Sequence, residues 1–132
     1  MRVGPVVRDD ETAAFFDGTA RGEFLLRYCP DGHPSSPHAQ LCDTCASADL
    51  TWRAASGEAS VISWAVAPGR PTGRGPDKPT VLVVAELAEG PWWWSHIKDA
   101  DPDRVTVGTP LTIQFERFSD QHEAVPVFAI AA

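Results

Sequence analysis

Residues 29–45 read CPDGHPSSPHAQLCDTC, a stretch that has almost no side chains able to build a hydrophobic core. All three cysteines of the chain lie in this stretch. Three cysteines cannot all pair, and only two residues separate Cys42 from Cys45, so a disulfide framework is not expected. Because a segment with so few apolar residues cannot fold by packing alone, the stretch indicates a bound metal ion.

The spacing is that of a zinc ribbon with one altered knuckle. Such a ribbon usually joins two Cys-x-x-Cys knuckles, and their four thiolates surround the zinc as a tetrahedron. The second knuckle is intact, whereas the first has Gly32 where its second thiolate would fall and His33 one residue later. His38 is a competitor for the fourth position. The expected ligands of a structural zinc are Cys29, His33, Cys42 and Cys45; the alternative is a ribbon that has lost its metal.

The segment before the ribbon predicts a short helix over residues 10–20. Acidic residues offer an N-cap, and two glycines offer a stop. Phe15 and Phe16 are its apolar contacts. Because two adjacent aromatic side chains on so short a helix cannot easily face one domain, we expect one to pack on the ribbon and the other to stay partly exposed.

The pattern after Gly57 is that of short β-strands. Residues 110–118 alternate apolar and polar side chains, which is typical of a half-buried strand. Pro126 suits an edge strand because it has no backbone N–H to donate. The expected strands are residues 59–67, 80–87, 104–107, 110–118 and 124–131.

Five short strands after a cysteine module predict a compact Greek-key barrel, of which the OB-fold is one example. Twelve prolines and ten glycines agree with a chain of short elements and many turns. The sequence therefore predicts a mainly β protein with three parts. These are a helical arm (residues 1–22), a rubredoxin-like zinc ribbon (residues 23–50) and a five-stranded OB-fold barrel (residues 51–132).

Three adjacent tryptophans, Trp92, Trp93 and Trp94, follow the strand 80–87. On a regular strand the side chains alternate, so the core could take Trp92 and Trp94 but not easily Trp93. Because Pro91 interrupts the ladder, we place the three residues at a corner of the barrel. We expect at least one indole to close the barrel and at least one to be exposed.

The net charge of −7 argues against a protein that binds nucleic acid through its phosphates. Residues 69–79 are the one net-positive stretch, with Arg70, Arg74 and Lys78 against Asp77. Those three cations could meet the phosphates of a nucleotide-like ligand, and the alternative is a solvated loop. No apolar run is long enough for a signal peptide or a membrane span, so a cytoplasmic protein is expected.

Signals for catalysis are weak. The chain has no dinucleotide-binding or phosphate-binding glycine motif and no His-Glu-x-x-His motif. His96 and His122 belong to no recognisable triad, and isolated surface histidines are common. A structural zinc with four protein ligands also leaves no open position for a substrate.

The order of these features resembles the zinc-ribbon plus OB-fold proteins that accompany thiolases in acyl-CoA metabolism. The resemblance covers nearly the whole chain from about residue 8, and it departs from the family at the first knuckle. The stretches that carry it are FFDGTARGEFLLRYC (15–29), LTWRAASGEASVISWAVA (50–67), PTVLVVAELAEG (79–90), VTVGTPLTIQFERF (105–118) and VPVFAIA (125–131).

The resemblance implies a non-catalytic accessory subunit with a thiolase-fold partner. Similar domains, often fused to a hot-dog-fold hydratase, partner a retro-aldolase that acts on the side-chain acyl-CoA of cholesterol catabolites in actinobacteria. This chain would then be a domain of a longer protein, with the catalytic residues on its partner. The partner interface would include Phe15, Phe16, Trp92, Trp93 and Trp94, because interfaces are rich in aromatic residues. Trp93, with Phe15 or Phe16, would be its anchor. The basic loop would lie near the phosphates of CoA.

Two other functions remain as alternatives. An OB-fold can bind single-stranded nucleic acid, with indoles as stacking platforms for bases, although the acidic balance counts against it here. An independent acyl-CoA hydratase or hydrolase would use His96 or His122 and would turn over substrate without a partner.

Overall fold

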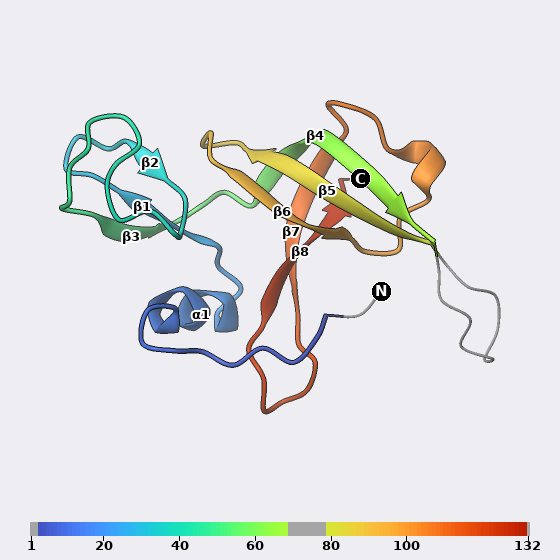
Figure 1. The fold of residues 1–132 in the computed structure, drawn as a ribbon, viewed down its shortest axis with the longest axis horizontal. Coiled ribbons are helices and arrows are strands. Elements are labelled where there is room, and N and C mark those ends of the chain that lie inside the picture. The colour runs from blue at the N-terminus through green and yellow to red at the C-terminus, as the bar shows by residue number, and fades with distance from the viewer. Residues whose placement is uncertain (1–2, 69–78, 132) are drawn as a thin grey trace.

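The computed structural model describes residues 3–68 and 79–131. It contains two β-sheets, and a short segment after residue 54 leads from the first sheet to the second (Figure 1). The first is a three-stranded sheet in the order β2-β1-β3, and the second is a closed barrel in the order β4-β5-β6-β8-β7. No helix in these described ranges is long and apolar enough to cross a membrane. The elements are α1 (Ala13–Ala20), β1 (Leu25–Tyr28), β2 (Pro34–Ser35), β3 (Thr51–Ala54), β4 (Glu58–Ala67), β5 (Thr80–Leu87), β6 (Trp92–Ile97), the 3-10 helix η1 (Pro102–Arg104), β7 (Pro110–Glu116) and β8 (Val125–Ile130).

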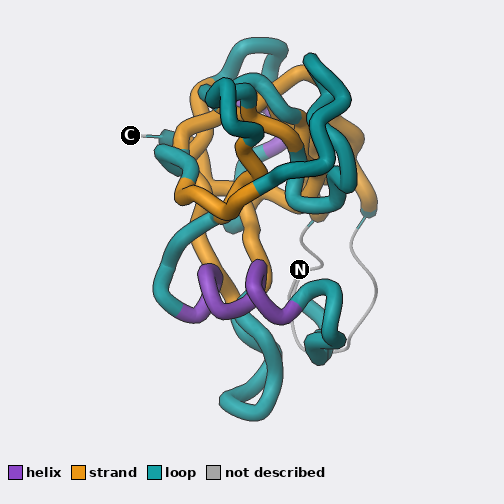
Figure 2. Tube along the Cα trace, turned by 90° about the vertical axis from the view of Figure 1, so that its left-hand side faces the viewer, coloured by secondary structure: helices purple, strands orange, loops and turns teal. Residues whose placement is uncertain are grey.

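Helix α1 begins three residues later than expected, because a turn precedes it. Asp9 accepts a hydrogen bond from the backbone N–H of Thr12, and the Thr12 hydroxyl accepts one from the N–H of Asp9, each at 2.9 Å. The acidic cap thus stabilises a turn before the helix. Figure 2 shows α1 beside the lower ends of the barrel strands, and Phe15 joins the hydrophobic core there.

The small sheet extends past residue 50, where we expected the barrel domain to begin. Strand β3 pairs with β1 in antiparallel register, from Leu25 opposite Ala54 to Tyr28 opposite Thr51. The barrel strands begin at Glu58. Residues 51–54 therefore complete the cysteine-containing sheet.

The barrel confirms the expected OB-fold, but one of its five strands differs from our assignment. Residues 92–97 form β6 and pair with β5 from Val81 opposite Ile97 to Glu86 opposite Trp92. The expected corner at the tryptophans and the expected strand at residues 104–107 are both wrong. Asp101 accepts a hydrogen bond from the N–H of Asp103 at 3.0 Å and starts η1 instead.

The barrel closes along β6 and β8, which run parallel and pair only at Ile97 opposite Phe128. The N–H of Lys98 donates to the carbonyl of Phe128 at 2.7 Å, and the Ser95 hydroxyl donates to the carbonyl of Pro126 at 2.9 Å. Strand β8 also pairs with β7 over six residues, so it is not the edge strand that Pro126 suggested.

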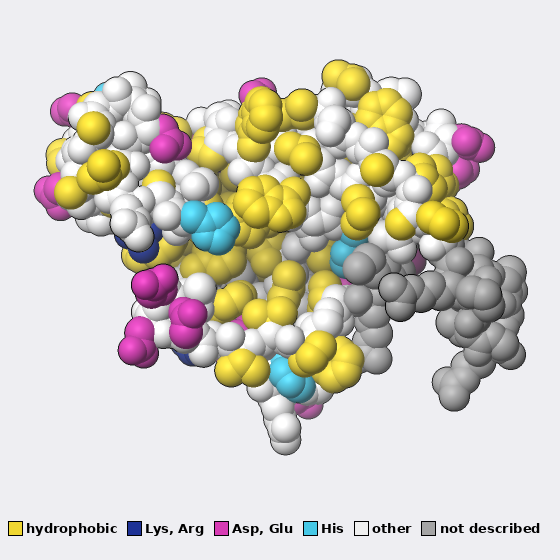
Figure 3. All heavy atoms as spheres, in the orientation of Figure 1, with side chains coloured by type: hydrophobic (Ala, Val, Ile, Leu, Met, Phe, Trp, Pro, Cys, Tyr) yellow, Lys and Arg dark blue, Asp and Glu magenta, His cyan; other side chains and the backbone are white. Residues whose placement is uncertain are grey.

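The segment before α1 is held against the loop between β7 and β8. The N–H of Glu123 donates to the carbonyl of Val6 at 2.8 Å, and the Arg8 guanidinium contacts the Glu123 carboxylate at 2.8 Å and Asp17 at 2.6 Å. Figure 1 shows this segment running beneath the barrel. It forms the far side of a hollow that is visible in the space-filling view (Figure 3).

Candidate metal centre and tryptophan surface

The first knuckle is built by the turn between β1 and β2. The N–H of Cys29 donates to the carbonyl of His33 at 3.2 Å, and Gly32 lies in the left-handed region with φ of 84°. A residue with a Cβ rarely adopts this conformation, so glycine at this position permits the turn. The turn brings the Cys29 Sγ within 3.3 Å of the His33 Nδ1.

The second knuckle lies against the first because Ser35 connects them. Ser35 is buried on β2, directly after the first knuckle, and its hydroxyl accepts a hydrogen bond from the N–H of Asp43 at 3.1 Å. The N–H of Thr44 lies 3.4 Å from the Cys42 Sγ. Ser35 was not singled out in the sequence, because a serine in the turn-rich stretch PSSP (34–37) carries no signal for this role.

The structure brings the four expected ligands together. One donor atom from each of Cys29, His33, Cys42 and Cys45 lies within 4.8 Å of the other three. Hydrogen bonds from the backbone of Cys45 and then of Thr44 lower the pKa of the Cys42 thiol from 9.0 to about 6. Because the thiolate is the form that binds a metal, this group is prepared for coordination. The cluster can hold a metal ion.

His38, the competitor for the fourth position, lies elsewhere. Its ring stacks on Trp93 with centroids 5.2 Å apart and an angle of 18° between the planes. It also lies 6.1 Å from the ring of Trp94. His38 thus joins the loop between the two knuckles to β6 of the barrel.

On a regular strand we expected Trp92 and Trp94 to face the core, but in the structure Trp93 faces it and the other two are exposed. Trp93 is half-buried and packs on Phe15 and Phe24, with ring centroids 5.8 and 5.1 Å away. Trp92 and Trp94 are 56% and 61% exposed. The expectation that one indole packs on the core and another is exposed therefore agrees with the structure, although Trp93 takes the inner position.

These positions change which aromatic residues can form a surface. Phe15 is buried, and Phe16 is partly buried against the core, whereas Trp92 and Trp94 project from β6. Trp94 stacks on Trp93 with centroids 5.3 Å apart. We call the exposed pair, Trp92 and Trp94, the tryptophan surface. Arg70, Arg74 and Lys78 lie outside the described residues.

The two remaining histidines differ in their surroundings. His122 lies in the loop after β7. Its Nδ1 is 2.6 Å from the hydroxyl of Ser119, which precedes it by three residues on the same exposed turn. His96 is only 6% exposed, although we regarded it as an isolated surface histidine. Burial lowers the pKa of His96, and the nearby carboxylate of Glu116 opposes that shift.

Several known proteins are similar to this chain. Residues 52–116 match the family described as ChsH2, C-terminal OB-fold domain. A DUF35 domain-containing scaffold protein of Pyrococcus furiosus is 30% identical over 80 residues, which are 61% of this chain and 59% of that protein. The 3-oxo-4,17-pregnadiene-20-carboxyl-CoA hydratase alpha subunit of Mycobacterium tuberculosis is 30% identical over 112 residues, which are 83% of this chain and 35% of that protein. The chain thus matches less than two thirds of either relative's length.

Two solved structures share the fold. A chain of the Ltp2-ChsH2(DUF35) aldolase superposes with a TM-score of 0.77 at 23% identity and covers 96% of this chain and 98% of that one. A DUF35 family protein of unknown function from Sulfolobus solfataricus has a TM-score of 0.62 at 14% identity, with 92% and 86% covered. The resemblance inferred from the sequence is confirmed, because residues 52–116 match the model of the ChsH2 C-terminal OB-fold domains and nearly the whole chain shares the fold of the ChsH2 chain.

Proposed function

We propose that this chain is a non-catalytic accessory subunit that binds a thiolase-fold partner acting on acyl-CoA. The observation that carries the proposal is the shared architecture with a chain of the Ltp2-ChsH2(DUF35) aldolase over 96% of this chain. The Pyrococcus relative is a scaffold protein, and the mycobacterial relative is a subunit of an acyl-CoA hydratase. The most specific form of the proposal is the partner of a retro-aldolase in steroid side-chain degradation.

The tryptophan surface is the proposed anchor for the partner. Exposed tryptophans are costly to hydrate, and tryptophan is among the residues that contribute most at protein interfaces. Trp93 supports this surface because its ring stacks on Trp94, and Phe15 packs on Trp93 and on Phe16 behind it. This assignment replaces Trp93 as the residue that contacts the partner.

Zinc is the proposed metal of the cysteine cluster, in a structural role. Three thiolates and one imidazole form a closed tetrahedral site for zinc, with zinc–sulfur distances of about 2.3 Å. Donor atoms on such a tetrahedron are separated by roughly 3.8 Å, from the same bond length. The four donor atoms within 4.8 Å of one another fit a zinc ion after a small contraction. When bound, the ion would hold the two knuckles together.

We also propose, from their charge alone, that the basic side chains of residues 69–79 contact the phosphates of CoA. Arg70, Arg74 and Lys78 form the net-positive part of the sequence, and CoA carries several phosphate charges that such side chains bind. Replacing the three by alanine should raise the KM of the assembled enzyme for its acyl-CoA substrate without preventing assembly. Unchanged KM would remove this contact from the proposal.

The experiment that tests the function is co-expression with candidate thiolase-fold proteins, in the presence or absence of a hot-dog-fold hydratase, fused or separate. We expect a stable complex and retro-aldol cleavage that requires both chains. We expect the complex to reside in the cytoplasm, where unpaired thiols stay reduced. Turnover by the purified chain alone would favour the hydratase or hydrolase alternative. Salt-dependent binding of single-stranded oligonucleotides would favour the nucleic-acid alternative.

Trp94→Ala is the variant for this experiment, and Val107→Ala is its matched control. Val107 is 70% exposed and lies outside the tryptophan surface, so its truncation removes apolar area without changing the proposed anchor. We expect Trp94→Ala to weaken partner binding by at least tenfold, as the loss of a central interface residue does. Equal effects of the two variants would place the interface elsewhere.

A further inference from the structure

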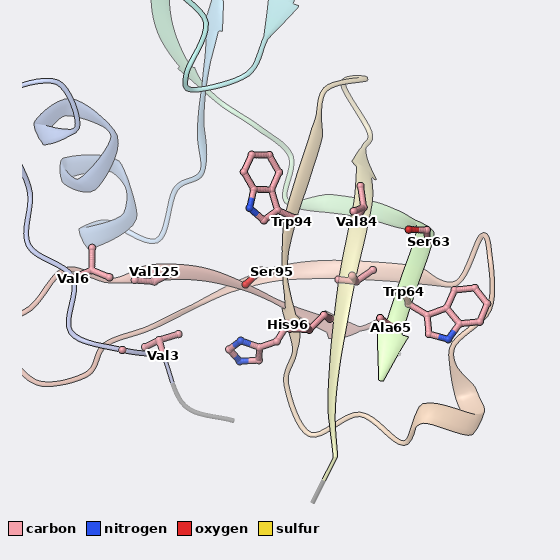
Figure 4. A pocket seen from close by; sticks show the side chains of 13 residues that line it. Val3, Val6, Ser63, Trp64, Ala65, Val84, Trp94, Ser95, His96 and Val125 are labelled. Atoms are coloured by element: carbon pink, nitrogen blue, oxygen red, sulfur yellow. The ribbon is translucent and has the colours of Figure 1, made fainter. Parts of the chain in front are cut away.

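A pocket of about 560 Å³ lies between the outer face of the barrel and the segment before α1. One wall is formed by Leu82 and Val84 of β5 with Trp94 of β6, and the opposite wall by Val3, Val6 and Val125. Figure 4 shows the imidazole of His96 on the side of β6 that faces Val3, while Trp64 points away from it. Pockets that bind small molecules measure roughly 300–1,000 Å³, so the volume suits such a ligand.

The walls of the pocket are mostly apolar, and His96 is the polar side chain that could bind a ligand atom there. The Ser95 hydroxyl, which also lines the pocket, already donates to the carbonyl of Pro126 at 2.9 Å. The His96 side chain is 6% exposed, and its Nε2 has no hydrogen-bond partner among the described residues. Because a buried polar atom without a partner is destabilising, the His96 imidazole in the wall of the pocket offers a binding position for a polar ligand atom.

The charged neighbours of His96 define what that ligand atom must be. The carboxylate of Glu116 on β7 lies 3.8 Å from Nε2, and its other oxygen lies 3.7 Å from the Nζ of Lys98 on β6. The separation of 3.8 Å is too long for a direct hydrogen bond. An oxygen about 2.8 Å from each atom would bridge the two.

The bridging oxygen must carry a hydrogen, because an ionised carboxylate can only accept. A hydroxyl can accept from the Nε2–H of a neutral imidazole and donate to Glu116 at the same time. An ether or a ketone lacks the hydrogen, and a carboxylate ligand would be repelled by Glu116. The geometry therefore selects an alcohol over these other oxygen compounds.

We propose that this pocket binds a small apolar molecule that carries one hydroxyl group, with the hydroxyl held by His96. The site belongs to the isolated chain and goes beyond the proposed role as a subunit. The pocket shares Trp94 with the tryptophan surface, but probe binding is measured on the chain without its partner, so the two proposals can fail separately.

The test compares two probes on the full chain: 2-(2-naphthyl)ethanol and its methyl ether. The two molecules share the same apolar body, and only the alcohol can donate a hydrogen bond. We expect the alcohol to bind about tenfold to hundredfold more tightly, because only the alcohol can donate a hydrogen bond to the charged carboxylate of Glu116. We also expect it to shift the Nε2 resonance of His96 in spectra of chain labelled with ¹⁵N-histidine.

Two variants complete the test. Leu82→Glu places a charge in the apolar wall at a side chain that is already 42% exposed, and it should abolish binding while the chain stays folded. Val107→Glu introduces the same charge outside the pocket and should bind as the unmodified chain does. His96→Phe should weaken the binding of both probes, because the oxygen of either one can accept a hydrogen bond from the Nε2–H. If His96→Phe fails to fold, the two wall variants and the two probes still decide the question.

The proposal is overturned if the two probes bind the unmodified chain equally. It is also overturned if the alcohol leaves the His96 resonance unchanged, or if Leu82→Glu binds the alcohol as tightly as Val107→Glu. A pocket that takes neither probe would also overturn it and would leave a protein side chain as the alternative occupant.

Discussion

Replacing Trp93 by alanine should destabilise the fold, although its neighbour Trp94 should tolerate the same change. The Trp93 ring lies on Phe24, Phe15 and His38, with centroids between 5.1 and 5.8 Å away. Truncation of a buried tryptophan costs about 3–5 kcal/mol. Because Trp93 is half-buried, we expect a loss near the lower end, about 3 kcal/mol.

Trp94→Ala shows how much stability is lost when a tryptophan on the exposed face of β6 is removed, and this loss is compared with that of Trp93→Ala. Trp94 is 61% exposed, and its main contact is the stacked ring of Trp93 at 5.3 Å. An aromatic pair contributes about 0.5–1.5 kcal/mol, so the expected loss is about 1 kcal/mol. Trp92, which is 56% exposed and lies 3.4 Å from Glu86 through its indole nitrogen, should lose less than about 1 kcal/mol.

Urea unfolding followed by far-ultraviolet circular dichroism measures these losses without relying on the indoles as reporters. A loss of about 3 kcal/mol in a domain of this size lowers the Tm by roughly 10 °C. Equal losses for Trp93→Ala and Trp94→Ala would refute the assignment of the two side chains to opposite faces of β6. A larger loss for Trp94→Ala would restore the alternation that we first expected from the sequence.

Three further predictions follow from the ribbon, the helix and the N-terminal segment. Purified chain should contain about one zinc, and Cys42→Ser should release it and unfold the ribbon, as elemental analysis and circular dichroism would report; unchanged ribbon structure after chelation would contradict a structural metal. Gly18→Ala should destabilise the chain by about 1–2 kcal/mol in urea unfolding, because the new Cβ would lie 2.5 Å from the Leu25 Cγ, and overpacking outweighs the better helix propensity of alanine. Arg8 holds the pKa of Glu123 below its usual value of 4.5 through a hydrogen bond, so this contact stabilises the fold above about pH 4.5 and is lost as the pH falls through the lower folded-state pKa. Unfolding measured against pH should therefore show Glu123→Gln to be less stable at neutral pH and equal to the unmodified chain in acid; a constant difference would exclude the carboxylate as its source.

The sequence was most informative where the relevant contacts are local. The grouping of the two knuckles could be predicted because its four side chains lie within 17 residues of the sequence, and the structure brings their donor atoms together. Strand β5 could be predicted to the residue, because residues 80–87 are rich in β-branched side chains. Both patterns depend on few residues outside their own segment.

Predictions were wrong where local bonding competes with strand propensity. Residues 104–107 contain two valines and a threonine, but the Asp101 cap and the hydrogen bond from the Thr106 N–H to the Thr109 hydroxyl favour a 3-10 helix and a turn. The burial of His96 could not be predicted, because it depends on the segment before α1, about 90 residues away in the sequence. Had residues 92–97 been assigned as a strand, the pairing of His96 with Leu82 would have followed from the register.

The parallel contact between β6 and β8 has a consequence for how the barrel opens. Successive residues of a strand direct their N–H and C=O groups to alternate sides, so Pro126 and Phe128 face the same neighbour, and the carbonyls of both bond to β6. Proline has no N–H, so this line of contact lacks the donor that another residue at position 126 would supply. Backbone amides of β6 that face β8 should therefore exchange with deuterium sooner than those of β5. When the barrel opens locally, we expect β6 and β8 to separate first, next to the pocket that contains His96. Pro126, the residue that suggested an edge strand, would then mark the point at which the closed barrel first opens.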